Sequence, residues 1–129
     1  MFNHVSVGVT DMDRAARFYD AALGALGYRR TFSESFGHAW GLKWPEFWAG
    51  TPHDGKPAMA GNGVHVAFIA PNRAAVDLFH AEGLKAGGVC AGEPGEREYT
   101  EDYYAAFLFD PDGNKVEAVH LPYVPFPTE

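Results

Sequence analysis

The chain has 129 residues, the size of one compact domain or of two half-domains that share a core. Its formal charge is -7 and its ten Lys and Arg residues are scattered, so nucleic acid and anionic membrane surfaces are poor candidates as partners. No apolar run is long enough for a membrane-spanning helix. The first residues, MFNHVSVGV, have the pattern of a strand and lack the features of a secretory signal, so we expect a cytoplasmic protein.

The first part of the chain predicts a strand, a helix and three more strands. Alternation indicates a strand over 3–9, and helical periodicity indicates a helix over 12–24 with Asp11 as its N-cap. The predicted buried positions of this helix are Ala15, Phe18, Tyr19, Ala22 and Leu23. Three short strand-like runs then follow near 27–34, 37–43 and 46–50.

The second part repeats this order after a connector. Residues 51–63 are rich in glycine and proline, which predicts a linking segment and no regular element. The elements expected after it are a strand over 64–70, a helix over about 72–86, a strand from Val89, an acidic loop over 92–102, and a hairpin of 103–109 with 115–121. We expect residues 122–129, which contain three prolines, to form an irregular tail.

The turn between the last two strands has the sequence DPDGN, from Asp110 to Asn114. It superficially matches the start of a calcium-binding loop. It lacks the remaining ligand positions and the closing glutamate of that motif, and it lies between two predicted strands. We assign it as a hairpin turn.

The two parts of the chain are related by an internal repeat. A shift of 61 positions places five residues of the first part on residues of the same type in the second part: His4 on His65, Val5 on Val66, Phe18 on Phe79, Leu23 on Leu84 and Gly27 on Gly88. The chain therefore consists of one β-α-β-β-β module that occurs twice, with a histidine on the first strand of each copy.

Three side chains are candidate metal ligands. His4 and His65 occupy equivalent positions, and Glu117 lies among apolar residues on the last predicted strand, where a buried carboxylate needs a partner. Two imidazoles and one carboxylate suit a divalent first-row metal and leave positions open for substrate. The alternative is that each histidine is hydrogen-bonded to backbone and that the glutamate faces water.

The remaining histidines and the cysteine receive structural assignments. Cys90 is the only cysteine, so the chain has no intrachain disulfide, and no activating residue pair is evident for it; a buried inert thiol is favoured over a nucleophile. The histidines assigned to structural or surface positions are His38, His53, His80 and His120. Of these, His80 is expected at the edge of the second helix, and His53 could close over a pocket.

Three segments resemble the vicinal oxygen chelate superfamily: HVSVGVTDMDRAARFYDAALGALGY, NGVHVAFIAPNRAAVDLFHAEGLKAGG and FLFDPDGNKVEAV. That superfamily includes glyoxalase I, extradiol dioxygenases, and the fosfomycin and bleomycin resistance proteins. The resemblance implies an α+β fold in which two βαβββ modules with mixed sheets enclose a cleft. It implies one domain over 1–129, with module one at about 1–50 and module two at about 64–121.

The resemblance also implies where a metal would bind. Ligands in the family lie on the first and fourth strands of each module, which carries this role onto His4, His65 and Glu117. The remaining position falls in PEFWAG, where Glu46 is the candidate donor. A shift of one residue would put Phe47 or Trp48 there instead, because neighbouring strand residues face opposite sides. The metal would be nickel, zinc, iron, manganese or cobalt.

The resemblance leaves more than one activity open. Isomerisation of the glyoxalase type needs a metal and a carboxylate base, and extradiol ring cleavage needs iron and an acid-base group such as Tyr103 or Tyr104. We assign Glu117 and Tyr104 as the catalytic residues of a metal-dependent enzyme that acts on a small oxygenated substrate, and we expect a homodimer.

The alternative is a metal-independent binding protein of the bleomycin-resistance type, which would hold its ligand in an aromatic groove. The aromatic residues assigned to substrate or ligand binding are Trp40, Phe47, Trp48, Tyr103 and Tyr104.

Overall fold

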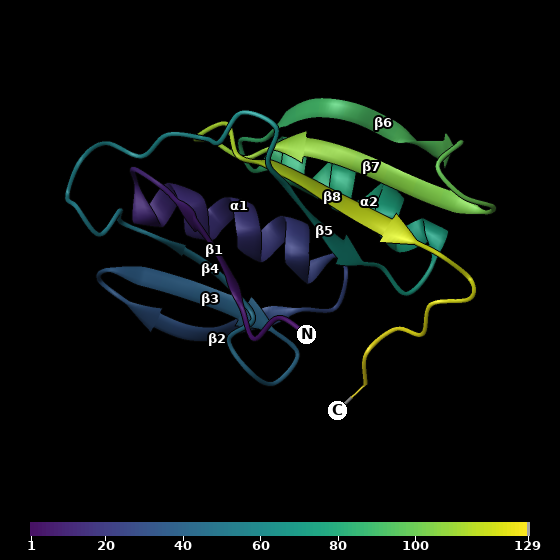
Figure 1. The fold of residues 1–129 in the computed structure, drawn as a ribbon, viewed down its shortest axis with the longest axis horizontal. Helices are drawn as coiled ribbons and strands as arrows, with labels where there is room; N and C mark the ends of the chain where they lie inside the picture. Colours follow the sequence, from purple (N-terminus) through teal and green to yellow (C-terminus); the bar gives the residue numbers. More distant parts are fainter. Residues whose placement is uncertain (129) are drawn as a thin grey trace.

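The structure is a computed structural model that describes residues 1–128. Two successive β-α-β-β-β halves make up the chain, as the sequence repeat predicts (Figure 1). The first half contains β1 (Val5–Gly8), α1 (Met12–Gly24), β2 (Arg29–Glu34), β3 (Gly37–Gly41) and β4 (Phe47–Gly50). The second half contains β5 (His65–Ile69), α2 (Arg73–Lys85), β6 (Val89–Arg97), β7 (Tyr103–Phe109) and β8 (Lys115–His120).

Each half forms its own four-stranded mixed sheet, so the expected fold class is confirmed. The strand orders are β1-β4-β3-β2 and β5-β8-β7-β6. In each sheet the first and last strands of the half pair in parallel, and the other neighbours are antiparallel. β1 and β5 each lie at a sheet edge, with His4 directly before β1 and His65 as the first residue of β5.

Both helices begin at a side-chain cap. Asp11 accepts a hydrogen bond from the Arg14 backbone N–H at 3.0 Å, and Asn72 accepts one from the Ala75 N–H at 2.8 Å. The backbone hydrogen bond from Arg14 holds the pKa of Asp11 below its ordinary value. These local bonds explain why the bounds of α1 match the prediction so closely.

The two helices pack against each other and lie between the two sheets, so the hydrophobic core is shared by both halves (Figure 1). Alternate strand residues point into this core, among them Phe47 of β4, Phe68 of β5 and Val116 of β8. The rings of Phe47 and Phe68 meet edge to face, with centroids 5.0 Å apart. The opposite side of each sheet faces away from the helices. We call these sides the first outer face and the second outer face.

The DPDGN turn joins the two halves, and its assignment as a hairpin turn is confirmed. The Asp110 N–H donates to the Asn114 carbonyl within the turn at 2.8 Å. The buried Asp110 carboxylate accepts the Tyr19 hydroxyl of α1 at 2.6 Å, and the Asn114 amide donates to the Gly8 carbonyl of β1 at 2.9 Å. Burial and the Asp110 carboxylate raise the pKa of Tyr19. The turn is therefore a structural link between the halves.

The prediction of an acidic loop over 92–102 is wrong for its first part. Strand β6 continues to Arg97, and its pairing with β7 shifts register between Cys90 and Gly92 and again between Gly92 and Gly95. A strand at the sheet edge tolerates these irregularities and also Pro94, because a proline on an edge strand need not interrupt the hydrogen bonds of the sheet.

The tail adopts no helix or strand over 122–128, and the Phe126 ring packs near Tyr28. Among the described residues, no helix has the length and apolar character needed to cross a membrane.

Candidate functional site

The second outer face contains a buried carboxylate with two partners. His65 lies on β5 and Glu117 on β8, and the parallel pairing of these strands places both side chains on the same side of the sheet. Nε2 of His65 is 3.0 Å from Oε1 of Glu117, and the Tyr103 hydroxyl donates a hydrogen bond to Oε2. Glu117 is only 1% exposed, whereas the side chain of His65 remains 45% exposed. Both oxygens of the buried carboxylate therefore have hydrogen-bond partners, and the partly exposed imidazole connects the site to solvent.

Tyr103 acts as a hydrogen-bond donor in this cluster. Burial raises its pKa well above the ordinary tyrosine value, and the bond to Glu117 and the charge of that carboxylate raise it further. The phenol therefore keeps its proton over the whole physiological range. Its hydroxyl donates this proton in the hydrogen bond to Oε2 of Glu117.

Two cations border the same face. The Nζ atom of Lys115 lies 5.1 Å and the guanidinium carbon of Arg97 5.5 Å from the ring centroid of Phe107. The Phe107 ring in turn lies beside the ring of His65, with centroids 6.0 Å apart. This face therefore combines a carboxylate–imidazole pair, an apolar ring and two positive charges.

His4 belongs to the first outer face, on the other sheet. It is exposed, its Nδ1 lies 2.7 Å from the Asn3 side-chain oxygen, and its ring lies 6.3 Å from the Trp48 ring. With Trp48 and His53 it lines a cavity of about 350 Å³. Since the helices separate the two sheets, one chain does not bring His4 together with His65 and Glu117. Within residues 1–128 those three do not form a group of converging donor atoms.

The strand registers identify the counterpart of Glu117 in the first half. Val5 pairs with Phe47, and Val66, which is the repeat equivalent of Val5, pairs with Val116. Trp48 therefore occupies the position that corresponds to Glu117. Glu46, the residue considered as a fourth ligand, instead lines a different cavity of about 230 Å³ between the halves. His4, His65 and Glu117 are not among the residues that line that cavity.

The aromatic residues assigned to one groove lie on different sides of the sheets. Trp40 and Phe47 are buried in the core, where they line the cavity between the halves, whereas Trp48 and Tyr103 lie on the two outer faces. Tyr104 points to the helix side, where its hydroxyl donates to Asp77 at 2.6 Å. Alternation along each strand separates these neighbours, so one chain does not assemble the groove. Tyr104 is therefore separated from Glu117, whereas Tyr103 is in contact with Glu117.

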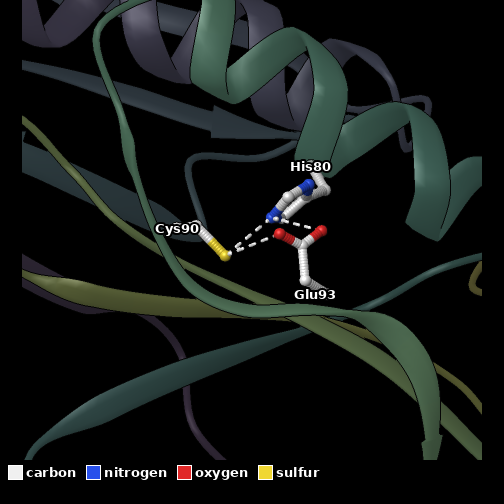
Figure 2. Close-up of side chains that lie close together, drawn as sticks. All are labelled: His80, Cys90 and Glu93. Carbon is white, nitrogen blue, oxygen red and sulfur yellow. Dashed lines mark hydrogen bonds and ion pairs between the residues drawn. The ribbon is translucent and has the colours of Figure 1, made fainter.

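A third cluster was missed by the sequence analysis. His80 of α2 lies beside Cys90 and Glu93 of β6, with Nε2 of His80 3.2 Å from Sγ of Cys90 (Figure 2). His80 is not at the helix edge: it is 5% exposed and shares the buried side of α2 with Val76 and Phe79. Helical spacing from those two residues was the signal that could have placed it inside. Cys90 is half-buried, where a buried thiol was expected, and His80 is an ionisable neighbour that the sequence did not reveal.

His38 and His120 each lie within hydrogen-bond distance of another group of the protein. Nδ1 of His38 lies 2.7 Å from the Ser33 hydroxyl, and Nδ1 of His120 donates to the Ala70 carbonyl at 3.1 Å. His53 lines the cavity that also contains His4.

Comparisons with known proteins identify the fold family. The chain is similar to the crystal structure of a glyoxalase/bleomycin resistance protein from Albidiferax ferrireducens T118, with 41% identity, 94% of this chain and 98% of that chain covered, and a TM-score of 0.83. A glyoxalase-related enzyme from Fulvimarina pelagi shares the fold at 17% identity, with 99% and 93% covered and a TM-score of 0.78. Lactoylglutathione lyase from Agrobacterium tumefaciens shares it at 18% identity, with 93% and 92% covered and a TM-score of 0.63.

No curated protein matches the chain. The family model described as the Glyoxalase/Bleomycin resistance protein/Dioxygenase superfamily matches residues 1–118, which is most of the chain. This agrees with the resemblance seen in the sequence and with the two β-α-β-β-β halves of the structure. The chain therefore belongs to the Glyoxalase/Bleomycin resistance protein/Dioxygenase superfamily.

Proposed function

We propose that this protein is a metal-dependent enzyme that acts on a small organic substrate with two neighbouring oxygen atoms. The metal is held by His65 and Glu117 of one chain and by His4 of a second copy. The observation that carries the proposal is the buried Glu117 carboxylate, whose Oε1 lies 3.0 Å from Nε2 of a partly exposed imidazole.

The donor atoms of this pair fit a divalent metal. Metal–nitrogen and metal–oxygen bonds of about 2.1 Å at a right angle put the two donors about 3.0 Å apart. The separation of Nε2 of His65 and Oε1 of Glu117 has this value before any metal is added. The bond from Tyr103 to the second carboxylate oxygen supplies the support that metal-binding carboxylates commonly have. Glu46 is left out of the proposed site because it lines the cavity between the halves.

A second copy would complete the ligand set. His4 lies on the first outer face and the His65–Glu117 pair on the second, with both helices between them. In a two-fold dimer, the first outer face of each copy can cover the second outer face of the other, which creates two equivalent sites. Large apolar side chains are exposed near both histidines. Phe36 lines the cavity that contains His4, Val64 lines a pocket with His65, and each of the two is 60% exposed. This favours association over an isolated chain.

The residues on the second outer face divide the chemistry between them. The metal, when bound, would stabilise negative charge that develops on the chelated substrate oxygens. Lys115 and Arg97 attract anionic oxygens to the face, and Phe107 provides an apolar wall. Glu117 is the proton acceptor of the site, and the protonated Tyr103 holds it in place. These roles suit proton transfer next to a carbonyl or enolate.

A metal-independent binding protein is the second candidate. Trp48 packs against Phe32 with ring centroids 4.9 Å apart, beside the cavity of about 350 Å³ that also contains His4. A flat ligand could stack there without a metal. Such a protein would show the same quenching of tryptophan fluorescence by its ligand before and after treatment with a chelator.

Metal content per chain tests the proposal. The measurement is made in a Cys90→Ser background, so that the separate thiol cluster does not contribute. We expect nearly one metal per chain in this parent, and loss of the metal in His65→Ala and in Glu117→Gln. Glu46→Gln is the matched control and should retain it. Equal metal content in the Glu117→Gln and Glu46→Gln proteins, or no uptake of nickel, zinc, iron, manganese or cobalt by the parent, would contradict the proposal.

A further inference from the structure

We propose that His80, Cys90 and Glu93 form a second metal site that binds Zn²⁺ and joins α2 to the edge strand β6. This site lies on the helix side of the second sheet, whereas the His65–Glu117 pair lies on its outer face. Of the residues described by the structure, these three make up the only group of three or more His, Cys, Asp or Glu side chains whose donor atoms all lie within 4.8 Å of one another. Figure 2 shows the three side chains turned toward a common point.

Each ligand reaches this point for a local reason. His80 is on the buried side of α2, and Cys90 pairs with Leu108, a core residue, so both side chains enter the space between helix and sheet. In a regular strand a residue three positions after Cys90 would face the opposite side. The register shift between Cys90 and Gly92 inserts one extra residue, and this bulge turns Glu93 back to the side of the thiol.

The distances between the donor atoms are close to those around a tetrahedral zinc ion, although the two contacts of Glu93 are made through different carboxylate oxygens. Zinc bonds of about 2.1 Å to nitrogen or oxygen and about 2.3 Å to sulfur, at tetrahedral angles, place neighbouring donors about 3.4–3.6 Å apart. Sγ of Cys90 lies 3.2 Å from Nε2 of His80 and 3.6 Å from Oε1 of Glu93, and Oε2 of Glu93 lies 3.9 Å from the same Nε2. Small side-chain rotations would therefore suffice to bind the ion.

The arrangement differs from that of an activated cysteine nucleophile. In a catalytic cysteine–histidine pair, a third group holds the imidazole through the nitrogen that does not face the sulfur. Here both Cys90 and Glu93 contact the same nitrogen, Nε2 of His80. The three donors therefore converge, as ligands do around a cation.

The chemistry of the donors selects zinc. Thiolate, imidazole and carboxylate are each groups that bind zinc, and thiolate disfavours magnesium and calcium. Without metal, the Cys90 thiol faces Glu93 Oε1 at 3.6 Å; the metal replaces the thiol proton and neutralises the two negative charges. The Glu93 side chain is 80% exposed, which leaves solvent access and an open fourth position.

Cobalt(II) provides a test that depends on the thiolate and not on activity. Titration of the metal-free protein with Co²⁺ should produce a thiolate-to-cobalt charge-transfer absorption whose final intensity corresponds to one thiolate-bound cobalt per chain, and which disappears when excess Zn²⁺ is added. Cys90→Ser should abolish this absorption. Glu93→Gln should weaken binding on the order of tenfold, because a neutral amide replaces the charged ligand. Glu98→Gln removes an exposed carboxylate from the segment that follows β6 and should bind like the parent.

Zn²⁺ should also raise the Tm of the parent and of Glu98→Gln, and raise that of Glu93→Gln less. Glu93 is exposed on an edge strand, so its variant is expected to fold normally, which circular dichroism can verify. Absence of a Cys90-dependent absorption, or equal cobalt affinity in parent and Glu93→Gln, would overturn the proposal. The same titration of a His65→Ala, Glu117→Gln protein should retain the absorption, so this outcome is independent of the outer-face site.

Discussion

The two outer faces come from the same repeated module and carry equivalent histidines, yet their surroundings differ. On the second face His65 meets a buried carboxylate at 3.0 Å, and Tyr103 holds that carboxylate from the other side. On the first face His4 is exposed and lies beside the Trp48 ring. The strand registers place Trp48 and Glu117 at the same position of the repeat. At this position of the last strand, the second face therefore has a carboxylate and the first has an aromatic ring.

This difference explains why one copy of the module is not enough for the proposed site. The second face provides two adjacent donors 3.0 Å apart, and the first provides one exposed donor beside an aromatic ring. The proposed site therefore needs the histidine of the first face as well as the imidazole and carboxylate of the second.

Removal of the carboxylate should have the largest effect. Glu117→Ala leaves His65 and Tyr103 without their shared partner and takes away the only charged ligand of the proposed site. We expect metal affinity to fall by on the order of 100-fold or more. Isothermal titration with the preferred metal measures this change, with Glu46→Ala as control. A loss of less than threefold in the Glu117→Ala protein would show that the second face is not the metal site.

Complementation tests whether the faces come from different copies. His4→Ala and Glu117→Ala proteins should each lose metal-dependent activity. After they are mixed and allowed to exchange subunits, the mixed dimer contains one intact site, so about a quarter of the parent's sites should return. Metal content or activity of the mixture provides the readout. No recovery, despite demonstrated subunit exchange, would mean that His4 does not act across copies.

Tyr103→Phe removes the hydroxyl that holds Glu117 and leaves the ring in place. Metal affinity should fall on the order of tenfold, which is the effect of losing a supporting hydrogen bond next to a ligand. The matched control is Tyr104→Phe, whose hydroxyl binds Asp77 on the helix side and should not matter for the metal. If both substitutions lowered metal affinity equally, the proposal that only the outer side of β7 supports the metal site would be contradicted.

Trp48→Glu makes the first face more like the second. The new carboxylate occupies the position equivalent to Glu117 and would join His4 as a fourth ligand in the composite site. We expect metal affinity to rise up to about tenfold. Trp48→Gln controls for loss of the ring. An affinity for Trp48→Glu no greater than that of the control would show that this position does not reach the metal.

The smallest predicted effect concerns stability in acid. Burial and then the nearby Arg30 lower the pKa of His38, so the folded protein resists protonation of this imidazole. Below about pH 6.5 the unfolded chain binds the extra proton more readily, and the free energy of unfolding should decrease as pH falls through this range. Urea unfolding from pH 7.5 to 5 measures the slope. His38→Gln should reduce it, and His53→Gln, in the exposed connector segment, should leave it unchanged.

Short-range features of the sequence determined much of the fold. The N-cap Asp11 and the spacing of apolar residues locate α1 at Met12–Gly24, because both signals act within a few residues of one another. The repeat of a histidine strand followed by a helix likewise predicts two β-α-β-β-β halves. The candidate pair of His65 and Glu117 also followed from the sequence, since a charged residue in an apolar strand needs a partner.

Tertiary structure alone decided how these pieces meet. The pairing of β4 with β1 determines which of Glu46, Phe47 and Trp48 occupies the position equivalent to Glu117. A shift of one residue in this pairing would move every side chain of the strand to the opposite face of the sheet. The cluster of His80, Cys90 and Glu93 depends on a bulge in β6 and on the packing of α2 over it. The separation of His4 from His65 follows from the contact between the two helices. Local periodicity specifies elements and faces, but register, bulges and helix packing arise from contacts between distant segments, and those contacts determine which donors come together.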